Sequence, residues 1–133
     1  MSETRMPRLV VVDDDDNLAR ELAGLFEDVG YEVTGVALDA RGGIDLVGRT
    51  RPDVVVMDVR MEGMSGTEAA DVLRREHPGV PVVLLSAYDD EGIVDAARRA
   101  QVAAYLVKGC SASELLTTVG TVVKQAQGAR RDK

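Results

Sequence analysis

Residues 54–58 read Val-Val-Val-Met-Asp, an apolar run that ends on a carboxylate. A strand whose apolar residues are continuous is buried on both faces, as parallel strands covered by helices on each side are. Comparable runs, each followed by a polar side chain, return at 9–12, 82–85 and 103–107. Residues 54–58 therefore predict a central strand in a parallel sheet of an α/β domain.

The segments between these runs carry apolar residues at helical spacing. The first such stripe runs from Leu18 to Val29 and stops at Gly30. A further strand is expected at 31–37, and the remaining helices are expected at 39–48, 67–76, 89–100 and around 115–123. Strand and helix alternate five times, which predicts a five-stranded sheet.

Length and composition fit one globular domain. The chain has 133 residues, of which 45% are hydrophobic and 29% are charged. Its net charge of −7 argues against a surface that binds the phosphates of nucleic acid. We expect an N-terminal extension at 1–8, a domain at 9–125, and a polar tail or the start of a linker at 126–133.

The sequence predicts a cytoplasmic protein. Cys110 is the only cysteine, so an internal disulfide is excluded and nothing indicates secretion. Residues 1–8 lack the hydrophobic segment of a signal peptide, and no apolar stretch approaches the length of a membrane span.

Reactive side chains follow four of the predicted strands. Ligands of an open parallel sheet bind outside the carboxyl ends of the strands. We therefore expect these side chains to converge on one edge of the sheet: Asp13 and Asp14, Asp58, Ser86, and Lys108.

Three carboxylates at one edge predict a cation site. Two like charges about 4 Å apart repel by roughly 1 kcal/mol in water and about 4 kcal/mol at an effective dielectric constant of 20. Such a cluster either holds a proton or recruits a cation. Mg2+ suits it, because Mg2+ takes one or two carboxylates and leaves positions for phosphate oxygens.

The same residues could receive a phosphoryl group. A carboxylate is a competent nucleophile toward phosphorus, and Asp58 is the best candidate because it ends the central strand. Mg2+ and the Lys108 ammonium would neutralise the transferred group from two sides, and the Ser86 hydroxyl could donate to one of its oxygens.

Each residue also has an ordinary structural explanation. The acids at 13–16 could cap the following helix, a role we expect for Asp15 or Asp16. Asp58 could be a turn residue, Ser86 a helix cap, and Lys108 a solvated charge. We favour the site because all four features fall at the same ends of alternating units.

Four segments resemble the signature segments of response-regulator receiver domains of two-component signalling. They are Leu-Val-Val-Val-Asp-Asp-Asp-Asp (9–16), Val-Val-Val-Met-Asp-Val-Arg-Met (54–61), Val-Val-Leu-Leu-Ser-Ala (82–87) and Ala-Tyr-Leu-Val-Lys-Gly (104–109). The resemblance implies a flavodoxin-like (CheY-like) doubly wound parallel sheet with strand order 2-1-3-4-5 and helices on both faces.

The resemblance also implies a role for each matching position. These are phosphoacceptor (Asp58), Mg2+ ligands (Asp13, Asp14, Asp58 and the backbone carbonyl of Arg60), switch residues (Ser86, Tyr105), phosphate-pairing lysine (Lys108) and loop glycine (Gly66). The implied partners are a sensor histidine kinase or phosphotransfer protein, a second receiver domain, and an output domain. Such a domain catalyses only its own phosphorylation and dephosphorylation. Tyr105 could instead be a half-buried strand aromatic.

Two positions depart from the family pattern. Glu62 and Gly109 stand where the family often has proline, and Gly109 argues against a cis bond after Lys108. The Lys-Gly pair, followed by Glu-Leu-Leu (114–116), resembles receivers that precede a helix-turn-helix output of the LuxR/NarL type. Transcriptional control is the expected output.

Two other functions compete with this interpretation. A haloacid-dehalogenase-type phosphohydrolase would use Asp13-x-Asp15, Ser86 and Lys108, but it needs a later acidic pair, and it leaves Asp58 unexplained. A receiver-like interaction module that never takes phosphate would have no use for the acidic cluster. His77, the only histidine, is expected in a solvated turn.

Overall fold

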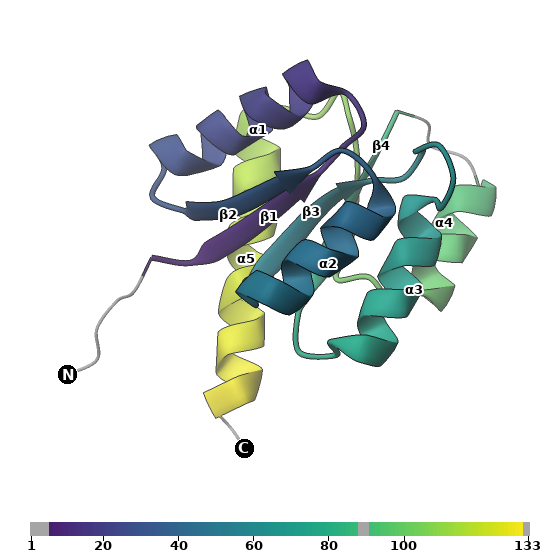
Figure 1. Cartoon of the computed structure of the whole chain (residues 1–133). Coiled ribbons are helices and arrows are strands. Elements are labelled where there is room, and N and C mark those ends of the chain that lie inside the picture. The colour runs from purple at the N-terminus through teal and green to yellow at the C-terminus, as the bar shows by residue number, and fades with distance from the viewer. Residues whose placement is uncertain (1–5, 88–90, 132–133) are drawn as a thin grey trace.

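The computed structural model describes residues 6–87 and 91–131 of the chain (Figure 1). Five strands alternate with five helices in this part of the chain. Their bounds are β1 Arg8–Val12, α1 Asp16–Asp28, β2 Glu32–Ala37, α2 Ala40–Thr50, β3 Val54–Asp58, α3 Gly66–Glu76, β4 Val82–Ser86, α4 Glu91–Arg99, β5 Ala104–Val107 and α5 Ala112–Arg131.

The strands form one parallel sheet in the order β2-β1-β3-β4-β5. Helices α2, α3 and α4 cover one face of this sheet, and α1 and α5 cover the other (Figure 1). The strand order reverses beside β1, so the carboxyl ends of β1 and β3 border the switch point. The predicted α/β class and strand order are confirmed.

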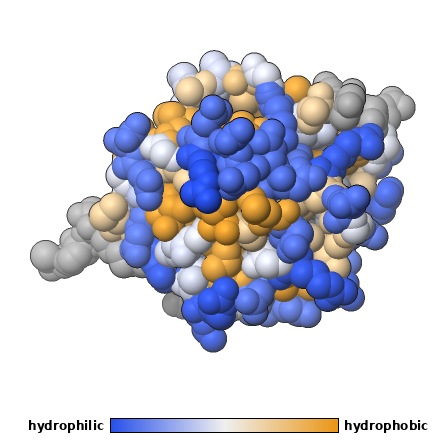
Figure 2. Space-filling model, turned by 45° about the horizontal axis from the view of Figure 1, so that its top comes forward, coloured by the Kyte–Doolittle hydropathy of each residue, from blue (hydrophilic) through white to orange (hydrophobic). Residues whose placement is uncertain are grey.

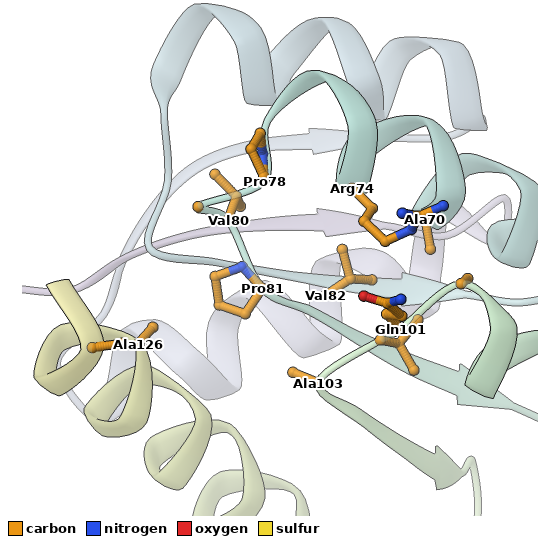
Figure 3. Close-up of a pocket in the computed structure, with 13 residues that line it drawn as sticks. Ala70, Arg74, Pro78, Val80, Pro81, Val82, Gln101, Ala103 and Ala126 are labelled. Carbon is orange, nitrogen blue, oxygen red and sulfur yellow. The ribbon is translucent and has the colours of Figure 1, made fainter.

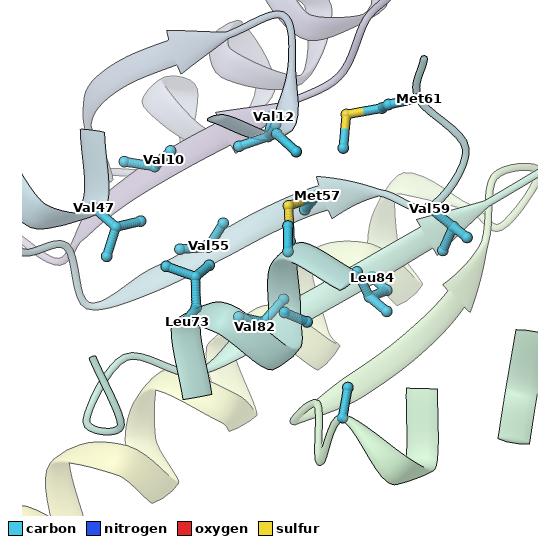
Figure 4. Packing of buried hydrophobic residues seen from close by; sticks show 14 of the residues in the cluster. Val10, Val12, Val47, Val55, Met57, Val59, Met61, Leu73, Val82 and Leu84 are labelled. Carbon is cyan, nitrogen blue, oxygen red and sulfur yellow. The ribbon is translucent and has the colours of Figure 1, made fainter. Parts of the chain in front are cut away.

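Each central strand supplies both hydrophobic layers. Along β3, Val55 and Met57 pack under α2 and α3, whereas Val54 and Val56 pack toward α1 and α5. Figure 4 shows the first layer, in which Leu73 of α3 lies over the valines of the sheet. Branched valines have few rotamers to lose and pack well on a pleated surface, which explains their use here.

Side-chain caps fix where the helices begin. Asp15 caps α1 by accepting from the Leu18 N–H at 3.2 Å. Ser65 and Glu68 form a capping box at the start of α3, in which each side chain accepts from the backbone N–H of the other residue. The expected cap of α1 therefore falls on Asp15.

Several boundaries differ from those expected. Strand β1 begins at Arg8, inside the predicted extension, because Arg8 pairs with Glu32 of β2 and its carbonyl accepts from the Asp53 N–H at 2.8 Å. Helix α5 continues to Arg131, so most of the predicted polar tail is helical. Alanine, glutamine and arginine are strong helix formers, and they extend this helix beyond its apolar stripe. The parts of the predicted segments at 1–5, 89–90 and 132–133 lie outside the described residues.

The surface seen in Figure 2 is mostly hydrophilic, with hydrophobic residues gathered in places between the polar ones. Val29, Val36 and Leu38 are among the exposed hydrophobic residues. Within the described ranges, none of the helices combines the length and the hydropathy that a membrane crossing requires.

Candidate metal centre at the carboxyl end of the sheet

Backbone pairing holds the predicted site residues at one edge of the sheet. The Asp13 N–H donates to the Ala37 carbonyl at 3.1 Å, which extends the pairing of β1 with β2. Asp58 ends β3 opposite Leu85 of β4. The Lys108 N–H donates to the Ser86 carbonyl at 2.7 Å. Parallel pairing therefore delivers all these side chains to the same end.

Three carboxylates meet at this edge. Asp13, Asp14 and Asp58 each place one carboxylate oxygen within 4.8 Å of the other two. Asp13 and Asp58 are buried, whereas Asp14 is exposed. The structure thus brings together the acids that the sequence places after two different strands.

One ammonium bridges the two buried carboxylates. Lys108 Nζ lies 3.1 Å from Asp13 Oδ2 and 3.3 Å from Asp58 Oδ2. Asp13 Oδ1 accepts from the Asp15 N–H at 2.9 Å. Asp13 Oδ2 is buried and has the ion pair with Lys108, but no hydrogen bond of good geometry. The Lys108 ammonium is therefore the one recorded partner of this oxygen among the described residues, and it serves Asp58 as well.

The environment favours a proton or a cation on Asp58. Burial raises the pKa of Asp58, the Asp13 carboxylate raises it further, and Lys108 and the backbone N–H of Arg60 oppose both. Burial by itself lowers the pKa of Lys108, but Asp13 and Asp58 outweigh burial, so the pKa is raised. Repulsion between the two buried carboxylates is therefore only partly relieved by the lysine.

The donor set fits a magnesium ion. All the available groups are hard oxygens, two of the carboxylates are buried, and the third is open to solvent. A buried oxygen that lacks a hydrogen bond is a natural ligand for Mg2+, which needs only a few protein ligands. The residues present are compatible with Mg2+.

The remaining predicted residues lie on β4, on β5 and in the loop after β3. Ser86 is fully buried at the end of β4. Tyr105 lies on β5 opposite Leu84, half-buried against the layer under α2–α4. Arg60 and Glu62 are exposed, and both line an open groove of about 750 Å³ beside Asp14. The backbone N–H of Arg60 donates to the Asp58 carboxylate. The role of its carbonyl as a metal ligand stays a prediction.

The sequence did not predict that Gly66 contacts the backbone of Asp58. The resemblance identifies it as a loop glycine, but the structure places it against the backbone of Asp58. A glycine at the first position of a helix, soon after the acidic strand end, was the available signal. No local pattern shows which backbone such a glycine touches.

Two smaller expectations can be compared with the structure. The described residues contain no cis peptide bond, as expected for Lys108–Gly109. His77 was expected to be solvated, but it is half-buried as the C-cap of α3, where its N–H donates to the Leu73 carbonyl at 2.7 Å.

The phosphohydrolase alternative requires Asp15 in the site, and the structure places this residue elsewhere. Asp15 is exposed, and its carboxylate accepts from the Leu18 N–H as the cap of α1. The pair Asp13-x-Asp15 therefore does not converge as that mechanism requires. Asp58, which the alternative leaves unused, belongs to the cluster and contacts Lys108.

A second cavity lies at the opposite end of the sheet (Figure 3). It has a volume of about 380 Å³, and Val80, Pro81 and Ala126 are among the mainly apolar residues that line it. None of the predicted site residues lines it, so it is separate from the acidic cluster.

The chain is similar in sequence to curated transcriptional regulators and response regulators. The chain is 34% identical over 125 residues to the transcriptional regulatory protein PdtaR of Mycobacterium tuberculosis, covering 93% of this chain and 60% of that protein. It is 31% identical to the response regulator GacA of Pseudomonas viridiflava, covering 88% and 55%. The chain therefore spans little more than half the length of these relatives.

Solved structures have the same fold. The receiver domain of the putative response regulator NarL from M. tuberculosis has a TM-score of 0.80 and 32% identity, covering 94% of this chain and 99% of that one. A LuxR-family response regulator from Aurantimonas sp. gives a TM-score of 0.86 and 25% identity, covering 91% and 87%. Residues 9–120 match the family described as response regulator receiver domain. Because this match takes in all four strand ends and most of the chain, the chain belongs to the response regulator receiver domain family.

Proposed function

We propose that this receiver domain accepts a phosphoryl group on Asp58 in a Mg2+-dependent step. The observation that carries the proposal is the meeting of three carboxylates with a single ammonium at the carboxyl end of the sheet. The donor would be a histidine of a sensor kinase or phosphotransfer protein, as membership of the family suggests.

Phosphoryl transfer exchanges one bond for another. An oxygen of Asp58 attacks phosphorus, the bond from phosphorus to the donor nitrogen breaks, and an acyl phosphate forms on Asp58. Mg2+ held by Asp13, Asp14, Asp58 and the Arg60 carbonyl would supply positive charge to the phosphoryl oxygens. Lys108 already lies beside Asp58 Oδ2, so its ammonium can pair with the new charge without a large movement.

The phosphorylated domain would switch between two conformations. Ser86 is fully buried in the neighbouring strand, where its hydroxyl can donate to a phosphoryl oxygen after a short inward movement of the loop after β4. Tyr105 would then rotate into the space that this loop leaves, because it already packs against the same layer. The face of α4, β5 and α5 would change shape, and partners would bind there.

The output is proposed from the relatives alone. The similarity to LuxR-family and NarL structures, and to a transcriptional regulator, favours control of transcription through a separate output domain or a second receiver domain. A cytoplasmic location fits this role. In this proposal the domain turns over its own aspartyl phosphate and no other substrate.

Phosphorylation with phosphoramidate in Mg2+, followed by intact-mass measurement, tests the proposal. Wild type should gain the mass of one phosphoryl group, and chelation of Mg2+ should abolish the gain. Asp58→Asn should stay unmodified, whereas Asp53→Asn, which changes a buried acid at the other end of β3, should be labelled. Labelling of Asp58→Asn at the wild-type level would refute the acceptor assignment. An unlabelled wild type that also fails to bind Mg2+ would favour the interaction module.

A further inference from the structure

Gly66 is the first residue of α3, and it lies directly against the end of β3. Its N–H donates to the Val59 carbonyl at 2.7 Å, which closes the loop that follows Asp58. A Cβ added to Gly66 would overlap the Asp58 carbonyl oxygen and lie 2.9 Å from both Asp58 C and Val59 Cα. Only a residue without a side chain allows this approach.

The contacted backbone has little freedom to move. The Val59 N–H donates to the Leu85 carbonyl at 2.9 Å, so the chain just after Asp58 is held by β4 on one side and by Gly66 on the other. Among the described glycines, Gly35, Gly42, Gly43 and Gly48 would meet side chains within 4 Å. Gly66 is the one that would meet backbone, which cannot rotate away.

The same peptide segment orients the acidic cluster. Asp58 carries one of the three carboxylates, and the next residue but one, Arg60, donates its backbone N–H to that carboxylate. The segment between Val59 and Gly66 is closed by their hydrogen bond, so a shift of α3 would move the Arg60 backbone relative to Asp13. The contact of Gly66 with this backbone therefore links the position of α3 to the geometry of the cluster.

We infer that Gly66 is a positioning residue of the phosphoryl site, which holds the Asp58 carboxylate and the Arg60 backbone in register with Asp13 and Asp14. This inference rests on the proposed function. It assigns α3 a part in binding Mg2+, although no side chain of that helix belongs to the acidic cluster.

The first test compares glycine-to-alanine substitutions by calorimetric titration with Mg2+. Gly66→Ala should weaken Mg2+ binding by about tenfold or more, the usual effect of disturbing groups that orient metal ligands. Gly24→Ala in α1 is the matched control, because its Cβ meets nothing within 4 Å. Ser65→Ala removes the capping side chain of α3 and should lower the melting temperature with Mg2+ affinity kept within about twofold of wild type.

A loss of folding can be distinguished from a loss of Mg2+ binding. If Gly66→Ala does not fold, it is introduced into a stabilised chain that also carries Gly24→Ala and Gly120→Ala. Both of these substitutions replace an unhindered helical glycine by a better helix former. A folded Gly66→Ala with the Mg2+ affinity of wild type would overturn the inference. A wild type that binds Mg2+ but takes no phosphate would refute the proposed function and leave the Gly66 measurement valid.

A second test needs no substitution. Coupling between two sites is reciprocal, so a contact that supports Mg2+ binding is itself supported by Mg2+. Amide hydrogen exchange of Gly66 in the wild-type chain should slow by about fivefold or more at saturating Mg2+. Leu73, further along α3, should keep its rate. Equal exchange of Gly66 with and without Mg2+ would contradict the inference even if no variant folds.

Discussion

Lys108 Nζ lies 3.3 Å from Asp58 Oδ2, at the same time as it lies 3.1 Å from Asp13 Oδ2. The two carboxylates come from β3 and from the end of β1, and the ammonium comes from the end of β5. One positive charge is therefore shared by two buried negative charges, which leaves the cluster short of positive charge until a cation binds.

Removal of the shared ammonium should destabilise the metal-free protein. Lys108→Met keeps the aliphatic stem but leaves two buried carboxylates without their partner, a loss of about 1–3 kcal/mol in the free energy of unfolding. Urea unfolding in chelator measures the change. Lys124→Met, at an exposed position of α5, is the control and should unfold like wild type. Equal stability of the two variants would show that the ion pair contributes nothing.

Neutralising Asp58 should stabilise the metal-free fold near neutral pH. The pKa of Asp58 is raised by burial and by Asp13, so the folded state holds its proton more tightly than the unfolded state. Ionisation of Asp58 therefore costs stability as pH rises from the ordinary carboxyl value of 3.8 through the raised pKa.

Asp58→Asn removes that cost, so its melting temperature should exceed that of wild type at pH 7. The difference should vanish in acid, below the ordinary carboxyl pKa. Asp53→Asn should lower the melting temperature instead, because a neutral amide oxygen is a weaker acceptor for the Arg8 N–H than the carboxylate is. A lower melting temperature for Asp58→Asn at pH 7 would contradict the direction of the pKa shift.

Magnesium affinity should depend on pH through Asp58. A proton on this carboxylate competes with the cation, so the dissociation constant should fall as pH rises through the raised pKa of Asp58 and then level off. Calorimetric titrations at a series of pH values measure this. In Asp58→Asn, binding should be weaker and the same step absent. A step of wild-type size in that variant would assign the titration to another group.

Truncation of Leu73 should be costly, although it lies away from the cluster. This side chain is 1% exposed and covers the valines of the sheet from α3 (Figure 4). Leu73→Ala should lower the free energy of unfolding by about 2–5 kcal/mol. Leu116→Ala, at a partly exposed position of α5, should cost less. Urea denaturation of both variants makes the comparison.

The sheet and the convergence of the site could be predicted from sequence because both depend on regular patterns. Continuous valine runs predict strands buried on two faces, and parallel strands bring their carboxyl ends to one edge. Asp13, Asp14 and Asp58 lie together for this reason. The strand order came from the family resemblance rather than from the runs themselves.

Other features depend on contacts between distant residues, which local patterns do not encode. The contact between Gly66 and the backbone of Asp58 follows from where α3 lies on the sheet. The start of β1 at Arg8 depends on Glu32 and Asp53. The length of α5 was underestimated because its last turns are helical by propensity, without the apolar stripe that marks its first part.

The alternation along β3 allows the two halves of the interior to be altered separately. Val55 and Met57 serve the layer under α2 and α3, whereas Val54 and Val56 serve the layer under α1 and α5. A protein engineer could therefore repack the interior beneath one pair of helices by changing every second residue of this strand, and keep the opposite layer and the terminal Asp58 as they are.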